Sequence, residues 1–323
     1  MPQPYAFDLL VVGDVNPDVV IGPLDAPLAF GQREQLVPAG LLTLGGSAAI
    51  MACGAARLGL TVALAGRVGD DEAGRFVRAA LEERGVDTGA LRVDTKLATP
   101  LTTVLTRSDG DRAILTVPGT LAATGPEDVP PRLLAASRHV HAASYFLLPE
   151  LAAALPELFA TARAHGATTS LDTNDDPAGR WAPGALGAVL AVTDVLLPNA
   201  REAVALAAAG GAHADSPEQA AAALAARGPC VVVKDGGDGC LAHDGTHVLR
   251  AAALPARPVD TVGAGDSFDA GFVAGRLGGL STAQCLRLAS ACGSLSTRAH
   301  GGTGAQPTWD EAHSALAREG KNL

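Results

Sequence analysis

One segment in the last third of the chain combines glycines, a helix start and an aspartate. Val259–Phe268 has the sequence VDTVGAGDSF, and Phe272, Val273 and Leu277 follow at the spacing of one helix face. A glycine-rich loop therefore opens directly into a helix. Gly263 and Gly265 let backbone N–H groups converge on an oxyanion. The helix start adds about half a positive charge. The pattern predicts a place to hold a phosphoryl group.

Asp266 falls in the first turn of that helix. The helix dipole favours its ionised form, so the carboxylate can accept a proton from an attacking hydroxyl group. The alternative is a purely structural role, in which the Asp266 charge only stabilises the helix dipole and the glycines only form a turn.

These residues need a scaffold, and the apolar pattern predicts one. Short apolar runs that indicate strands occur at Leu9–Gly13, Thr61–Ala65 and Cys230–Lys234, among others, and helical patterns lie between them. This alternation predicts an α/β fold with a central, mostly parallel sheet and helices on both faces. No internal repeat or linker divides the chain, so we expect one domain over residues 1–323.

Two stretches interrupt the alternation, at residues 18–42 and 97–120. The second contains two β-rich runs around Ser108–Asp111, which is typical of a hairpin. We expect the two stretches to form one small β-sheet lid over the carboxyl edge of the main sheet. An exposed apolar face on this lid would favour a homodimer.

Composition excludes several classes of protein. The chain has 323 residues and a net charge of −10, a poor footprint for binding nucleic acid or anionic lipid. No apolar run is long enough to span a bilayer, and no basic leader precedes Leu9, so we expect a cytoplasmic protein. The five cysteines form no C-x-x-C pair and are expected to be reduced thiols. Gly13–Asn16 lacks the G-x-G-x-x-G of a dinucleotide-dependent oxidoreductase.

The Val259–Phe268 segment closely resembles the second signature of the ribokinase-like (PfkB) carbohydrate kinase family, D-T-x-G-A-G-D-x-F. The resemblance implies that the backbone of Gly263, Ala264 and Gly265 forms an anion hole and that Asp266 is the catalytic base. Further similarities follow in family order along almost the whole chain. They imply a ribokinase-like fold and ATP-dependent phosphorylation of a hydroxyl group, most simply a primary alcohol of a sugar or sugar-like molecule.

The resemblance also implies a substrate site near the N-terminus. Asn16 and Asp18 follow the first strand, where family members bind sugar hydroxyls, and Gly45 and Gly46 match the family's Gly-Gly segment. Ile50 stands where the family usually has an asparagine. A substrate hydroxyl facing Ile50 without a partner would cost about 1–3 kcal/mol. We therefore expect a substrate that is deoxygenated, substituted or apolar at that point, a lid residue that supplies the bond, or a buried Ile50 that never meets the substrate.

A nucleotide site is implied by three further segments. Asn199 and Glu202 resemble the family's N-x-x-E motif, which organises Mg²⁺ and phosphate, usually through water; alone, they would be a helix cap. Asp172–Asn174 is similar to a family segment near the phosphates, although Asp176 replaces a nearby arginine. The remaining nucleotide candidates lie in the strand and turn beside them: Lys234, Gly236 and Gly239. Many family members also bind a monovalent cation such as K⁺, with help from the aspartate that corresponds to Asp260.

Taken together, ATP, Mg²⁺ and a small sugar-like substrate are expected, with K⁺ as an activator. Two alternatives remain open at this point. One is a regulator that binds a sugar or nucleoside and has lost catalysis; the intact Gly263–Asp266 segment opposes it. The other is a nucleoside kinase, because motifs do not determine the pocket that selects the acceptor.

Overall fold

A nine-stranded sheet forms the centre of the molecule in this computed structural model, which describes residues 5–109, 111–181 and 186–319. The strand order is β13-β12-β11-β10-β9-β8-β1-β4-β5, parallel from β11 to β5, with β12 and β13 antiparallel at one edge. The strands are β1 (Phe7–Val12), β4 (Val62–Gly69), β5 (Val86–Asp94), β8 (Ser137–Ala142), β9 (Thr168–Leu171), β10 (Val195–Leu196), β11 (Cys230–Lys234), β12 (Cys240–His243) and β13 (Val248–Ala251).

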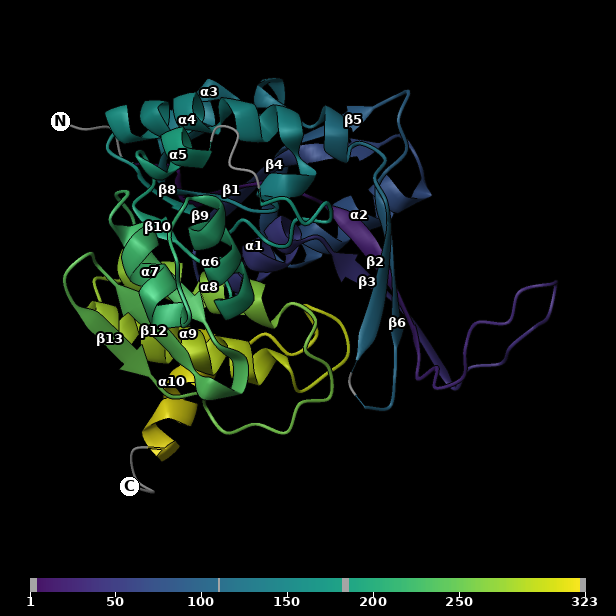
Figure 1. The fold of residues 1–323 in the computed structure, drawn as a ribbon. Helices are drawn as coiled ribbons and strands as arrows, with labels where there is room; N and C mark the ends of the chain where they lie inside the picture. The colour runs from purple at the N-terminus through teal and green to yellow at the C-terminus, as the bar shows by residue number, and fades with distance from the viewer. Residues whose placement is uncertain (1–4, 110, 182–185, 320–323) are drawn as a thin grey trace.

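Helices cover both faces of this sheet (Figure 1). Successive side chains of β1 point to opposite faces of the sheet, and both sets are apolar. Leu10 and Val12 belong to one apolar cluster, and Leu9 and Val11 belong to another, so both faces must be covered. The first cluster is closed by α3 (Pro131–Ala136), α4 (Pro149–Ala164), α5 (Leu186–Leu190), α6 (Ala200–Ala209) and α7 (Pro217–Ala225). The opposite face is covered by α1 (Ser47–Arg57), α2 (Glu72–Glu83), α8 (Ala264–Leu277), α9 (Thr282–Ser296) and α10 (Trp309–Glu319).

A second sheet of four strands projects from this body (Figure 1). Its order is β3-β2-β6-β7, with β2 (Asn16–Gly22), β3 (Ala39–Gly45), β6 (Leu101–Thr106) and β7 (Arg112–Val117). The expected β lid is therefore present, although its strands begin at Asn16 and end at Gly45, slightly outside 18–42. Short 3₁₀ turns lie at Leu121–Ala123, Pro126–Asp128, Tyr145–Leu147 and Gly236–Asp238.

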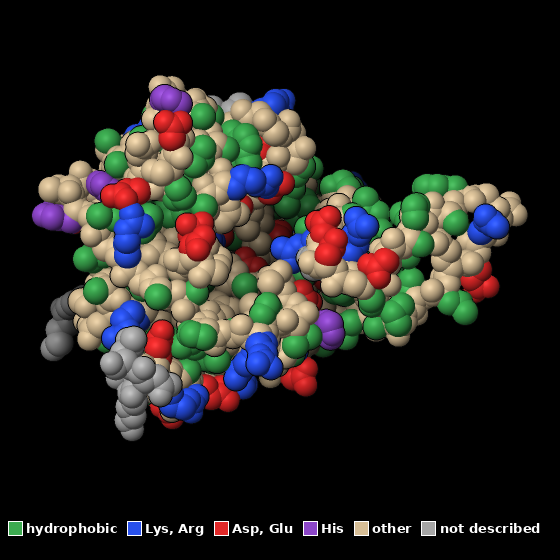
Figure 2. All heavy atoms as spheres, turned by 60° about the horizontal axis from the view of Figure 1, so that its bottom comes forward, with side chains coloured by type: hydrophobic (Ala, Val, Ile, Leu, Met, Phe, Trp, Pro, Cys, Tyr) green, Lys and Arg blue, Asp and Glu red, His purple; other side chains and the backbone are tan. Residues whose placement is uncertain are grey.

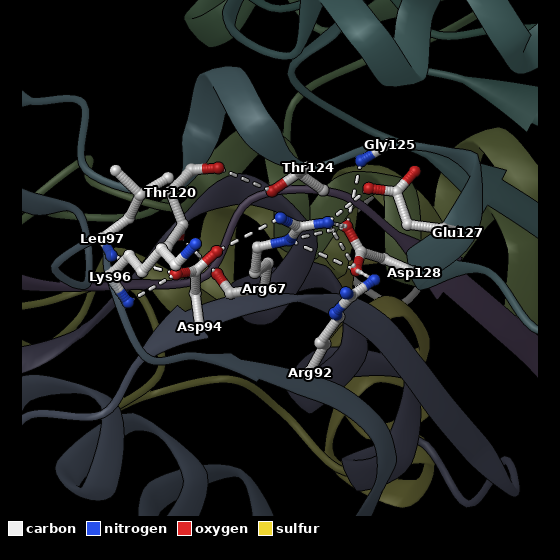
Figure 3. Close-up of polar contacts among 10 residues, drawn as sticks. All are labelled: Arg67, Arg92, Asp94, Lys96, Leu97, Thr120, Thr124, Gly125, Glu127 and Asp128. Atoms are coloured by element: carbon white, nitrogen blue, oxygen red, sulfur yellow. Dashed lines mark hydrogen bonds and ion pairs between the residues drawn. The ribbon is translucent and has the colours of Figure 1, made fainter.

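The root of the lid carries a partly buried ion cluster, which we call the lid-root cluster: Arg67, Asp94, Glu127 and Asp128 (Figure 3). The Arg67 guanidinium lies 3.0 Å from Asp128 and 3.3 Å from Asp94. Since the Asp128 side chain has no exposed area, its charge depends on Arg67 and on Arg92 at 3.4 Å.

This cluster holds both ends of the β6–β7 hairpin. Asp94 accepts hydrogen bonds from the backbone N–H groups of Lys96 and Leu97, just before β6. Thr120, just after β7, donates its hydroxyl to the carbonyl oxygen of Arg67 at 2.7 Å. Side-chain hydrogen bonds therefore connect both ends of the β6–β7 hairpin to the main body, and we call this connection the hinge of the lid.

Helix α7 begins after Ser216, whose side chain accepts the N–H of Gln219. Across the described ranges, no helix is both long and apolar enough to cross a membrane.

Candidate active site

The Val259–Phe268 segment forms the predicted loop and helix start. Helix α8 begins at Ala264, and Gly263 precedes it with a φ of 72°, a left-handed conformation that favours glycine. The N–H of Ala264 donates to the Thr261 carbonyl oxygen at 3.3 Å. Within the described part of the chain, no backbone acceptor is paired with the N–H groups of Gly265 and Asp266. These donors are free to bind an anion at the helix start.

Asp266 is buried at this helix start. Burial, reinforced by the carboxylates of Asp172 and Asp14, raises the pKa of Asp266 to about 8, while Lys234 and a hydrogen bond with Ser47 oppose the rise. A carboxylate with a raised pKa is a stronger base than an ordinary one and suits proton abstraction from an alcohol.

A buried ion triplet lies under the loop. The Lys234 Nζ is 2.6 Å from Asp172 and 3.0 Å from Asp269. A Cβ placed on Gly265 would lie 3.6 Å from that nitrogen, so the ammonium adjoins the anion loop directly. Burial alone would lower the pKa of Lys234, but the two carboxylates raise it above its ordinary value. Burial raises the pKa of Asp269 well above its ordinary value, and the ammonium group of Lys234 opposes that rise.

Asn16 and Asp18 come together where β2 leaves the body. The Asn16 amide donates to Asp18 at 2.8 Å, and both side chains are buried. A Cβ on Gly45 would lie 1.9 Å from an Asp18 oxygen, so only glycine lets the carboxylate lie against β3. Burial, with the negative charges of Asp14 and Asp260, raises the pKa of Asp18 to about 7.

Asp14 links the two halves of the site, and the sequence argument missed its importance. Its carboxylate accepts the N–H groups of Ser47 and Ala48 at 3.0 Å each and so caps α1 after Gly46. Its charge acts on both Asp18 and Asp266. The available signal was its position just after the first strand, two residues before Asn16.

Ile50 is 3% exposed and packs behind the anion loop. A Cβ on Gly263 would lie 3.0 Å from its Cγ2, and a Cβ on Gly302 would lie 2.5 Å from its Cδ1. Ile50 therefore holds two glycine loops in place, in keeping with the expectation of a buried residue. Contact between Ile50 and a substrate stays a prediction.

Asn199 and Glu202 form a reciprocal cap at the start of α6. The Asn199 side chain accepts the Glu202 N–H, and the Glu202 carboxylate accepts the Asn199 N–H, each at 2.9 Å. Burial, with the charge of Asp172, raises the pKa of Glu202 to about 7. The described residues hold no cluster of three or more metal-binding side chains. One buried carboxylate with few protein ligands fits Mg²⁺ held mainly by phosphates and water.

The remaining candidates surround this centre. Gly236 has open space where a side chain would be, so a ligand can approach it, whereas Gly239 packs against the carbonyl oxygen of Ala251. Asp260 accepts the N–H groups of Val262 and Gly301 at 2.9 Å each and so joins two loops. Asp176, in place of the expected arginine, accepts backbone N–H groups of its own loop.

The side chains of the site come from strand ends and helix starts on one edge of the sheet. Figure 2 shows a hollow between the body and the projecting arm, with acidic and basic side chains around it. A buried base, free N–H donors and a hydroxyl-binding pair can together support phosphoryl transfer to an alcohol.

Comparisons with known proteins also indicate an enzyme that transfers a phosphoryl group to a sugar. Residues 6–309 match the model of the pfkB family carbohydrate kinases. An ATP-dependent ribose-1-phosphate kinase of Halopiger xanaduensis is 35% identical, over 96% of this chain and 98% of that protein. A fructokinase of Klebsiella pneumoniae is 34% identical, over 84% and 91%. A 5-dehydro-2-deoxygluconokinase of Shouchella clausii is 29% identical, over 94% of each chain.

Solved structures show the same fold. Arabidopsis thaliana ribokinase complexed with ribose and ATP has a TM-score of 0.81 and 26% identity, and the match covers 98% of this chain and 99% of that one. A ribokinase II of Escherichia coli, described as putative and solved with ATP and Mg²⁺, has a TM-score of 0.83, 23% identity and coverage of 96% and 99%. Fold and relatives define an ATP-dependent sugar kinase. The chain belongs to the pfkB family of carbohydrate kinases.

Proposed function

We propose that this kinase transfers the γ-phosphoryl group of ATP to a primary alcohol of a small sugar bound between Asp18 and Asp266. The observation that supports this most strongly is that the buried Asp266, with its raised pKa, lies in the same helix turn as the N–H groups of Gly265 and Asp266, which have no backbone partner among the described residues. The base and the anion-binding donors lie on the same helix turn, so a hydroxyl activated by one faces a phosphoryl group held by the other.

Each residue then has a defined role. Asn16 and Asp18 orient the acceptor hydroxyls, because an amide both donates and accepts and a carboxylate accepts twice. Asp266 takes the proton from the attacking alcohol. The Gly263–Gly265 backbone stabilises the negative charge that spreads over the transferred group. Closure of the lid excludes water, which otherwise competes as acceptor.

On the nucleotide side, Gly236 and Lys234 lie beside the polyphosphate. Glu202 and Asn199 would hold Mg²⁺, which when bound would neutralise charge on the phosphates. The chain's own contribution is to keep the Glu202 carboxylate buried and oriented by its two hydrogen bonds to Asn199.

The acceptor can be identified by measuring ADP release with ATP and a panel of sugars. The names of the relatives place ribose 1-phosphate, fructose and 5-dehydro-2-deoxygluconate in the panel, and nucleosides test the nucleoside-kinase alternative. We expect ADP release that depends on one acceptor. Acceptor binding without ADP release for any compound would favour the regulator that has lost catalysis.

We also propose that K⁺ activates the enzyme through the two loops that Asp260 joins. Replacing K⁺ with a large organic cation should lower turnover, since the ion would no longer order the loop before Gly263. An unchanged rate would reject this role.

We further propose that the protein is cytoplasmic and has no nucleic-acid partner. We also propose that two copies form a homodimer through the lid. Leu36 and Phe30, between β2 and β3, are 92% and 88% exposed, and burying them in a second copy would be favourable. Light scattering of the wild type and of Phe30→Glu should give dimer and monomer masses. A monomeric wild type would contradict the dimer.

A further inference from the structure

The inner face of the lid carries a continuous polar row. Pairing across the four strands sets four residues directly opposite one another: Thr43, Asp18, Thr102 and Thr116. Two positions nearer the tip, the next row on the same face is apolar: Leu41, Val20, Val104 and Ile114. Because Asp18 belongs to the polar row, this face is the one that meets the acceptor.

Hydrogen bonds connect the residues of the polar row. The Asn16 Nδ2 donates to Asp18 at 2.8 Å and lies 3.2 Å from the carbonyl oxygen of Pro17 and 3.3 Å from the Thr102 hydroxyl. The Thr102 and Thr116 hydroxyl oxygens are 3.1 Å apart, and either can be the donor. Thr102 is buried and Thr116 is exposed, so the Thr116 hydroxyl can also hydrogen-bond with a bound molecule.

Arg112 lies on the same face of β7, four residues from Thr116 and opposite Thr106. Its guanidinium donates to the Thr261 hydroxyl at 3.3 Å, so it leans from the lid toward the loop that leads to Gly263. Arg112 forms no ion pair with any residue in the described ranges, and it is the one cationic residue in the four lid strands.

The inner face of β7 thus carries two donors, Arg112 and Thr116, on either side of the apolar Ile114. Asp14, Asp18 and Asp266 all lie in the centre, so an anionic acceptor needs a cation to enter. An unpaired guanidinium matches a phosphate or carboxylate, which accept several hydrogen bonds at once. A neutral sugar would leave those donors to water.

We propose that the acceptor is a sugar that carries an anionic group, bound by Arg112, with the Thr116 hydroxyl donating to a further acceptor oxygen of the same molecule. This inference rests on the proposed function and adds the chemical class of the substrate. Arg112 is thus a residue that determines specificity, separate from the transfer machinery of Asp266.

The test compares D-ribose 1-phosphate with D-ribose, which differ by the phosphate, and adds 5-dehydro-2-deoxygluconate as a carboxylate. The wild type should prefer an anionic compound. Arg112→Gln should lower kcat/KM for that compound about 10- to 100-fold, as expected for a lost charged hydrogen bond, and leave the KM for ATP unchanged. Arg112→Lys should recover part of the loss, and Thr116→Val should lower kcat/KM for the same compound.

Arg107→Gln is the matched control, because Arg107 lies on the same hairpin but outside the inner face of the four strands. It should behave as the wild type. Preference for a neutral sugar, or an equal loss with all acceptors together with a higher KM for ATP, would overturn the inference while leaving the kinase assignment intact. ADP release with none of the acceptors would instead count against the proposed function.

Discussion

The ammonium nitrogen of Lys234 lies 2.6 Å from the carboxylate of Asp172, directly beneath the loop that contains Gly265. This contact brings a positive charge into a centre that also holds Asp266, Asp269 and Glu202. It lowers the pKa of Asp172, despite the burial that would raise it. The ionised Asp172 contributes to the raised pKa of Asp266, and the ammonium group of Lys234 opposes that contribution.

Removing the lysine should destabilise the protein. Lys234→Met leaves the buried Asp172 charge without its partner, which costs about 3–5 kcal/mol. Urea unfolding measures the loss. The double variant Lys234→Met/Asp172→Asn is the control, and it should recover much of the stability because the buried Asp172 charge is removed together with its partner. A loss below about 1 kcal/mol in the single variant would contradict a structural role for the pair.

The pH dependence of the reaction should report Asp266. A general base acts in its ionised form, and this group has a pKa of about 8. The kcat/KM for the acceptor should therefore rise with pH through about 8 and fall as protonation removes the base below that pH. Asp18, with a pKa of about 7, should steepen the fall at lower pH. A profile that is flat between pH 6 and 9 would be inconsistent with this base.

How much of this site the sequence could predict depends on the range of the contacts. The loop and helix start that carry Gly263, Gly265 and Asp266 could be predicted because these residues lie in one loop and one helix turn, where local spacing determines the geometry. The parallel strands were found because each is a short apolar run between helices. Ribokinase-like architecture followed from these elements and from motif order.

The pairing of two distant segments in the lid was predicted, but the side-chain contacts between distant parts of the site were not. Asp269 meets Lys234 and Asp172 only after three elements come together at the sheet edge. The direction of the Ile50 side chain depends on how α1 packs against the loops at Gly263 and Gly302. A sequence pattern gives the types of these residues, and the tertiary fold decides which of them meet.

The lid-root cluster should matter for both stability and lid position. Arg67→Met removes the main partner of Asp128, whose side chain has no exposed area, so a loss of about 3–5 kcal/mol is expected. The looser hinge should also raise the KM for the acceptor, because the polar row moves with the lid. Thermal unfolding and steady-state kinetics check both effects. Arg75→Met, which removes an exposed pair with Glu72, is the control and should change stability by less than about 1 kcal/mol.

The central claim is that Asp266 removes the proton from the acceptor while the adjoining N–H groups hold the phosphoryl group. The most direct measurement is turnover and nucleotide binding for Asp266→Asn, which keeps the size of the side chain and removes the base. The account predicts a fall in kcat of about 10²- to 10⁴-fold with ATP affinity retained. A variant that turns over at nearly the wild-type rate would contradict it.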